Sequence, residues 1–128
     1  MTTQQSSMTT QDVANRLVAL CREGKIKEAS EELHSDDVIG EEPNARDPQH
    51  KIVQGKAAIA EKGNQFASMI EAMHGGSISD PIVGGEYFSI AWTMDVTMKG
   101  MGRMEMSEIC NYRVKDGKIV WEQFLYSM

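Results

Sequence analysis

Cysteine is scarce in this chain, and its two thiols form no recognisable motif. Cys21 and Cys110 are far apart among the 128 residues, and neither belongs to a CxxC pair or has a His at metal-ligand spacing. We therefore expect no metal and no cofactor, with both thiols acting as small core residues in a reduced compartment. A disulfide between them is the alternative that the sequence leaves open.

Clustered positive charge is also missing. The 13 Lys and Arg residues are scattered and are outnumbered by 19 Asp and Glu residues, which gives a net charge of −6. A surface for nucleic acid needs grouped basic side chains that neutralise phosphates. The composition therefore argues against a nucleic-acid partner.

Long apolar runs are absent as well. No stretch approaches the roughly 20 apolar residues that cross a bilayer, and residues 1–11 consist largely of Thr, Gln and Ser without the apolar centre of a signal peptide. We expect a disordered arm over 1–11, a single domain over 12–128, a cytoplasmic location and no membrane partner.

Apolar residues at helical spacing are present in the first part of the chain. They predict a helix that Asp12 caps and Gly24 ends, a shorter helix over 25–34, and a long helix from 56 to about 72. Between the last two helices, residues 37–42 have the composition of a strand that Pro43 stops. The polar segment 44–54 is predicted to be a loop.

The remainder of the chain alternates apolar and polar residues with a period of two. This pattern predicts four antiparallel strands in a meander from about Ser77 to the end of the chain. Helices followed by antiparallel strands indicate an α+β fold with the helices packed on one sheet face.

The turn at Asp116-Gly117 sets the register of the last two strands. A two-residue type I′ turn would place Val114 and Ile119 on one face, whereas a three-residue loop with a bulge at Gly117 pairs Val114 with Lys118. We favour the three-residue loop because it gives the cleaner apolar inner face. It also places Glu122 opposite Cys110.

Two carboxylates interrupt that inner face, and they are the candidate catalytic residues. In the favoured register Glu108 lies diagonally from Glu122. Two acids that close in an apolar site cannot both ionise cheaply, so one of them should hold a proton near neutral pH. Such a pair is suited to general acid–base chemistry. The alternative is that each acid is paired with a Lys or Arg, or lies at the solvated end of the sheet.

Further residues are expected to line a ligand pocket with these acids. Glu42 has the parity of an inward-facing residue at the end of the first strand. The other candidates are the large inner-face side chains Trp92, Met94, Met106, Tyr112, Phe124 and Tyr126. Ordinary core packing is the alternative for each of them. We interpret His34 and His50 as surface residues and His74 as a helix-end residue.

Four segments of the chain resemble a known family. They are the helix start Gly-Lys-Ala-Ala-Ile at 55–59, the segment 112–120 around Asp116-Gly117, the strand 38–43 and the final 122–126. Together they resemble the SnoaL-like branch of the nuclear transport factor two-like superfamily. The resemblance implies a cone, in which a strongly curved antiparallel sheet wraps around about three helices and leaves a cavity at its open end.

The resemblance also bounds the function. Members include polyketide cyclases, ketosteroid isomerase-like enzymes, epoxide hydrolases and dehydratases, and others that only bind or dimerise. The Tyr and Asp of the ketosteroid isomerases have no counterpart here, because Cys21 and Cys110 lie near the matching positions. The His–acid pair of the dehydratases has no evident counterpart either, and metal-assisted hydrolysis is disfavoured because no His pairs with the acids at ligand spacing.

We therefore expect a small hydrophobic ligand and a cofactor-free isomerase, cyclase or lyase that uses Glu108 and Glu122. The alternative is a non-catalytic module for ligand binding or dimerisation. The opposite, outer sheet face carries the apolar residues Ile109, Trp121 and Leu125. By the resemblance, a homodimer would form through this convex face.

Overall fold

The computed structural model describes residues 8–44 and 47–127, apart from the side chains of 43–51. Of the arm predicted over 1–11, residues 1–7 lie outside the described residues, and the first helix already begins at Thr10. Within the described residues the elements are α1 (Thr10–Arg22), α2 (Ile26–Leu33), β1 (His34–Asn44), β2 (Asp47–Gln54), α3 (Lys56–Met69), β3 (Ile70–Ile78), β4 (Ile82–Gly84), β5 (Tyr87–Met98), β6 (Gly102–Lys115) and β7 (Lys118–Tyr126).

The N-cap of the first helix lies three residues before the predicted one. Thr9 is the N-cap: its side chain accepts from the backbone N–H of Asp12, and the Asp12 carboxylate accepts from the backbone N–H of Thr9. This reciprocal pair is a capping box. The prediction that Asp12 itself caps the helix is therefore wrong, and Asp12 occupies the third helical position. One face of α1 is buried, with Val13, Ala14, Leu17, Val18, Leu20 and Cys21 in the core.

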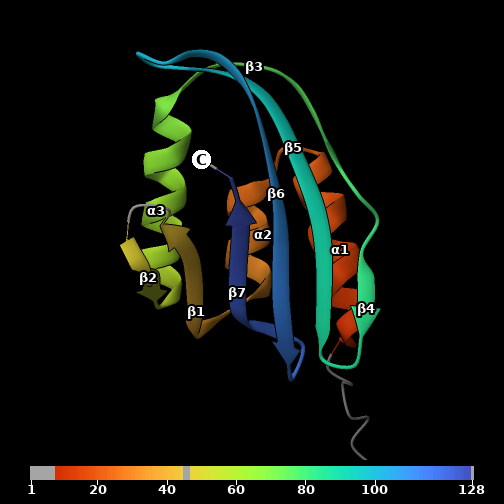
Figure 1. Cartoon of the computed structure of the whole chain (residues 1–128). Coiled ribbons are helices and arrows are strands. Elements are labelled where there is room, and N and C mark those ends of the chain that lie inside the picture. Colours follow the sequence, from red (N-terminus) through yellow and green to blue (C-terminus); the bar gives the residue numbers. More distant parts are fainter. Residues whose placement is uncertain (1–7, 45–46, 128) are drawn as a thin grey trace, which may run out of the picture.

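The strands form one strongly curved, mixed sheet that wraps around the helices (Figure 1). The strand order is β2-β1-β7-β6-β5-β3, with β4 also paired to β5. The pairing of β1 with β7 is parallel, and the other pairings are antiparallel. The α+β class is confirmed. The C-terminal strands β4 to β7 pair antiparallel in chain order, as predicted, and the sheet also contains β1, which was not predicted to lie parallel to β7.

The segment predicted to be a loop over 44–54 is also corrected. Residues 47–54 form β2, which pairs with β1 at the end of the sheet order. An edge strand has one side without a strand neighbour, and polar residues are common there because they discourage further pairing. The polar composition that indicated a loop is therefore also compatible with an edge strand.

The hairpin between β6 and β7 differs from the favoured register. Asp116 and Gly117 have φ angles of 51° and 76°, and Val114 pairs with Ile119, as in a two-residue type I′ turn. The extra residue lies further along, since Arg113 pairs with Trp121 and Val120 is left in a bulge. This bulge turns Glu122 back to the inner face. Alternation alone does not distinguish a bulge at the turn from one just beyond it.

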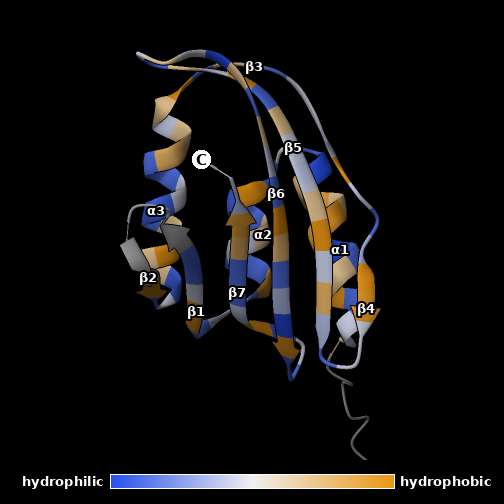
Figure 2. Cartoon of the chain, in the orientation of Figure 1, coloured by the Kyte–Doolittle hydropathy of each residue, from blue (hydrophilic) through white to orange (hydrophobic). Residues whose placement is uncertain are grey.

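The core lies between the helices and the concave face of the sheet. Apolar and polar residues alternate along β5, β6 and β7 (Figure 2). Both cysteines are free and buried here, which agrees with their predicted role as core residues. Burial raises the pKa of the Cys21 thiol to about 12 and raises that of Cys110 as well. Within the described residues, no helix is long and apolar enough to span a membrane.

Candidate functional site

The concave face of the sheet divides into two regions that differ in burial. We call the covered region the packed half, and it comprises Phe88, Ile90, Cys110, Tyr112, Val114, Ile119 and Glu122, all buried. We call the other region the open half, in which the inner-face side chains of Val96 and Met98 are buried and the following are partly exposed: Trp92, Met94, Met104, Met106, Glu108, Phe124 and Tyr126. The open half is a mostly apolar surface, and Glu108 is its carboxylate.

Glu108 lies on β6 between two aromatic residues of the neighbouring strands. It pairs with Trp92 on β5 and with Tyr126 on β7. The Cys110 thiol donates to its Oε1 at 3.5 Å. Within the described residues no Lys, Arg or His forms an ion pair with Glu108. Its carboxylate is therefore held on an apolar surface with little compensation.

The surroundings raise the pKa of Glu108 above its ordinary value. Burial is the largest cause, and the negative charges of Glu42 and Glu122 add to it. The thiol of Cys110 and the ammonium group of Lys62 act in the opposite direction. A carboxylate with a raised pKa is a stronger base than an ordinary one, so Glu108 is suited to accept a proton from a ligand.

Glu122 lies in the packed half and is bonded to a histidine. Its Oε1 is 2.5 Å from His34 Nε2, and Ser30 Oγ is 2.7 Å from His34 Nδ1. Only 8% of His34 and 3% of Glu122 are exposed. The interpretation of His34 as a surface residue is therefore wrong, because α2 ends at Leu33 and His34 begins β1 beside Ile119.

The two carboxylates are also further apart than the favoured register placed them. Glu108 pairs with Tyr126 and Glu122 pairs with Tyr112, with the pair Cys110 and Phe124 between them on the same face. The separation along the strands is four residues, roughly 13 Å. A proton shared directly between the two acids, as predicted from the sequence, is excluded by this register.

Glu42 faces the interior and is paired with a lysine of α3. The Nζ atom of Lys62 is 2.6 Å from Glu42 Oε1, and both side chains are 22% exposed. The same Nζ lies 5.1 Å from the centre of the Phe124 ring. Glu42 and Lys62 both influence the pKa of Glu108, so this pair lies within electrostatic reach of the open half.

The two tyrosines of the predicted pocket have different surroundings. Tyr112 is buried and stacked on Phe88, with ring centres 4.6 Å apart, and burial raises its pKa well above the ordinary value. Tyr126 is partly exposed opposite Glu108. Burial and the charges of Glu42 and Glu108 raise the pKa of Tyr126, so its hydroxyl stays protonated and able to donate. Tyr112 is a core residue, and Tyr126 belongs to the open half.

Three residues of this site were not found from the sequence: Ser30, His34 and Lys62. Lys62 follows Ile59 by three residues, so helical spacing alone places both on one face of α3. Ser30 and His34 are separated by four residues, which brings them together at the end of α2. The contact of His34 with Glu122 depends on the pairing of β1 with β7, for which the sequence gives no local signal.

His74 does not join the site. The prediction that it lies at a helix end is wrong, because α3 ends at Met69 and His74 lies on β3, where it is exposed and its Nε2 is 2.7 Å from Thr97 Oγ1. The side chain of His50 lies outside the described residues. In the part of the chain that the structure describes, no three His, Cys, Asp or Glu side chains are grouped so that they could hold a metal ion.

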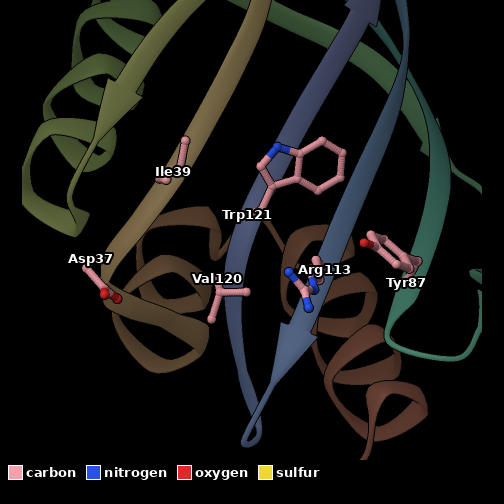
Figure 3. Close-up of a pocket in the computed structure, with 6 residues that line it drawn as sticks. All are labelled: Asp37, Ile39, Tyr87, Arg113, Val120 and Trp121. Atoms are coloured by element: carbon pink, nitrogen blue, oxygen red, sulfur yellow. The ribbon is translucent and has the colours of Figure 1, made fainter.

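A separate hollow lies on the convex face of the sheet. Figure 3 shows its six side chains on the side turned away from the helices: Asp37, Ile39, Tyr87, Arg113, Val120 and Trp121. Trp121 Nε1 donates to Glu41 Oε2 at 2.9 Å, which orients the indole ring. Ile109 and Leu125 are also well exposed, at 45% and 41%. This face is partly apolar and is separated from the open half by the sheet.

Comparison with known proteins gives one matching family model and many similar structures. The family model of the SnoaL-like domain matches residues 8–126. A protein from Mesorhizobium loti, named as a candidate SnoaL-like polyketide cyclase and also as a carbohydrate phosphatase, is 33% identical, with a TM-score of 0.84 over 93% of this chain and 100% of that one. No curated protein matches.

More distant structures share the fold. IdmH, a candidate polyketide cyclase from Streptomyces antibioticus, is 17% identical with a TM-score of 0.70 over 94% of this chain and 93% of that one. A candidate isomerase from Bacillus subtilis is 20% identical with a TM-score of 0.68 over 94% and 90%. The family model and the Mesorhizobium structure each cover nearly the whole chain, so the chain belongs to the SnoaL-like family.

Proposed function

We propose that this protein is a cofactor-independent acid–base enzyme that binds a small, mostly apolar carbonyl compound in the open half. The observation that carries the proposal is the position of Glu108, a carboxylate with a raised pKa among partly exposed apolar side chains. Burial of a carboxylate lowers the stability of the fold, and side chains held in this way cluster at functional sites. The names of two similar structures as candidate polyketide cyclases, and of a third as a candidate isomerase, support this class.

The lining of the open half suits an apolar ligand. Trp92 and Phe124 supply aromatic surface, while Met94 and Met106 have flexible side chains that adapt to irregular shapes. Polar groups are few there, which fits the usual lining of a small-molecule site.

In the proposed reaction Glu108 removes a proton from the carbon next to the carbonyl group. The electrons of that C–H bond move into the carbon–carbon bond, and the carbonyl oxygen takes the negative charge. The Tyr126 hydroxyl donates a hydrogen bond to this developing oxyanion. Return of the proton to another carbon completes an isomerisation. In a cyclisation the enolate carbon attacks a second carbonyl carbon and the protonated Glu108 returns its proton to the alkoxide oxygen, and in an elimination the leaving group departs with that proton.

Glu122 has an indirect role in this proposal. Its carboxylate is bonded to His34 and buried, so it lies out of reach of a ligand in the open half. Its negative charge adds to the rise in the pKa of Glu108. We therefore assign proton removal to Glu108 and treat Glu122 as a residue that strengthens this base.

The test uses a substrate that requires only a desolvated base. Removal of the ring C–H proton of 5-nitrobenzisoxazole opens the ring to a coloured phenolate. We expect the parent to accelerate this reaction and Glu108→Gln to lose the acceleration, by about 100-fold or more. Glu105→Gln, on the exposed side of the same strand, is the matched control and should keep the parent rate.

Two outcomes would contradict the enzyme proposal. One is equal rates for the parent and Glu108→Gln. The other is a parent rate no higher than that of a carboxylate buffer, together with quenching of Trp92 fluorescence by the probe. That second result would favour a module that binds a ligand without turning it over.

We further propose that two copies of the chain associate through the convex face. The exposed side chains of Ile109 and Leu125, on the same sheet face as the hollow around Trp121, support this arrangement. Light scattering should report twice the chain mass for the parent and a single chain for Leu125→Arg. A monomeric parent would contradict it.

We place the protein in the cytoplasm. Two buried cysteines that remain free are compatible with a reducing compartment. Detection of the native protein in a secreted or periplasmic fraction would contradict this assignment.

A further inference from the structure

Lys62 is held at the edge of the open half by two contacts from different strands. Its ammonium group is bonded to Glu42 of β1 and lies over the ring of Phe124 of β7. Both contacts reduce the freedom of a long side chain, which is 22% exposed. An ammonium group has three donors, and within the described residues the one bond that Lys62 donates is to Glu42. In the described part of the chain Lys62 therefore offers a fixed positive charge with further donors for a ligand.

The position of Lys62 relates it directly to the proposed base. Phe124 and Tyr126 both face inward on β7, and Tyr126 pairs with Glu108. Lys62 lies over Phe124, which is two residues before Tyr126 on the same strand, and Tyr126 is the cross-strand partner of Glu108. Its charge acts on the Glu108 carboxylate, and no contact joins the two groups among the described residues. A ligand in the open half would lie within reach of a base and of a separate cation.

The charges of the site favour a ligand that is neutral when it binds. Among the described groups that act on Glu108, the carboxylates of Glu42 and Glu122 are negative and the ammonium group of Lys62 is positive, so an ionised Glu108 and its neighbours would repel a permanently anionic ligand. Proton transfer to Glu108 neutralises that carboxylate and moves its charge to the ligand oxygen. The sum of these charges does not change, and the negative charge has moved to an atom that Lys62 can contact.

We propose that Lys62 binds the carbonyl oxygen of the substrate and stabilises the enolate that forms when Glu108 removes the proton. The substrate class is then a neutral carbonyl compound with a stabilised enol, such as a β-dicarbonyl or a phenol-forming ketone. This inference rests on the proposed function: it adds Lys62 as a cationic donor to the oxyanion besides Tyr126, and it narrows the carbonyl substrates to neutral ones that form a stabilised enol. In the step, the Lys62 N–H donates to the oxygen and keeps its proton, while the C–H electrons become the enolate π bond.

The role of Glu42 follows from the same arrangement. It fixes the Lys62 ammonium group and partly cancels its charge, so its removal should leave a lysine that attracts an oxyanion more strongly. A purely structural tie between β1 and α3 predicts something else. In that case the removal of either partner would have the same consequence for a ligand.

The experiment uses 2-naphthol as an enolate mimic, because its neutral and ionised forms have distinct absorption spectra. It is carried out in Glu108→Gln, whose amide stands in for the base after it has taken up the proton. We expect bound naphthol to ionise at a lower pH than free naphthol, by about one pH unit or more. Adding Lys62→Met should abolish this shift and weaken naphtholate binding about 10-fold, and Lys62→Arg should keep most of it.

Glu42→Gln, added to Glu108→Gln, gives the decisive control. We expect it to shift the ionisation of bound naphthol to still lower pH, opposite in sign to Lys62→Met. Circular dichroism confirms that each variant is folded. Shifts of the same sign in Glu42→Gln and Lys62→Met would overturn the proposal in favour of a structural tie. An unchanged midpoint in Lys62→Met, or no binding of naphtholate at any pH, would overturn it as well.

The two proposals fail separately. Proton removal from 5-nitrobenzisoxazole depends on Glu108 and tests the enzyme class, whereas the naphthol midpoint is measured without that base. If the rate of proton removal depends on Glu108 but Lys62→Met does not change the ionisation midpoint of naphthol, the enzyme proposal stands and the role of Lys62 is excluded. An effect of Lys62 on naphthol without any Glu108-dependent rate leaves an oxyanion-binding site without catalysis.

Discussion

The packed half and the open half belong to the same sheet face, and each contains one glutamate, but the two glutamates have opposite surroundings. Glu122 is buried with a histidine partner at 2.5 Å, whereas Glu108 is partly exposed and bonded to a thiol. The two residues have the same chemistry and the same parity, and they lie on neighbouring strands. What differs is the cover that the helices and β1 provide. The comparison shows that a side chain's parity gives its face, while the packing above that face decides its chemistry.

The largest expected effect is a loss of stability, and it is tested with two phenylalanines, one in each half. Phe88 in the packed half is 1% exposed, and Phe124 in the open half is partly exposed. Phe88→Ala should lower the free energy of unfolding by about 4 kcal/mol, since it leaves a cavity in a covered core. Phe124→Ala should cost about 1–2 kcal/mol, because less apolar area leaves the solvent there. Urea titrations of both variants measure the difference, and equal losses would show that the open half is packed in solution.

The next effect concerns the bond between His34 and Glu122. Removal of one partner of a buried pair leaves the other without compensation, so Glu122→Ala should lower the free energy of unfolding by about 3 kcal/mol. The double variant His34→Leu with Glu122→Leu removes both polar groups and restores apolar volume. It should be more stable than Glu122→Ala. If both variants were as stable as the parent, the pair would be solvated and the packed half would not be closed.

The smallest effect is a gain in stability at Glu108. Its pKa is higher in the folded chain than in the unfolded chain, so the folded state binds more protons between the two values. Stability is therefore lost as the pH rises through this window, and it is recovered in acid. Glu108→Gln should have a higher urea midpoint than the parent at pH 7, and the gap should close near pH 4. The groups that face Glu108 are Glu42, Lys62, Cys110, Glu122 and Tyr126.

Glu105→Gln is the control for this titration. Glu105 lies on the same strand with its side chain exposed, so its replacement should change the midpoint equally little at both pH values. A parent that is more stable than Glu108→Gln at neutral pH would show that Glu108 is compensated, and the distinction between the two halves would then fail.

The fold could be predicted from the sequence largely because its signals are local. The buried stripe of α1 and the even-numbered inner face of β6 follow from periods of 3.6 and 2. The placement of Glu108 and Glu42 on the inner side has the same origin. The polar edge strand β2 was missed, because its composition matches that of a loop.

The candidate site was less predictable, because its contacts join distant parts of the chain. The bulge at Val120 decides whether Glu122 faces Cys110 or Tyr112, and alternation does not record which residue is extra. The contact of His34 with Glu122 requires β1 to lie parallel to β7. That pairing comes from packing, which no short segment of sequence contains.

The parallel pairing of β1 with β7 has a consequence for the order of folding. It brings His34 to Glu122, 88 positions later, and Trp121 to Glu41, 80 positions earlier. In the sheet, β7 lies between β1 and β6 (Figure 1). Closing such long loops is entropically costly, so this seam is expected to form late and slowly. On a ribosome, helices α1 to α3 emerge long before β7. Until β7 arrives, one edge of β1 is unpaired and open to association with other chains.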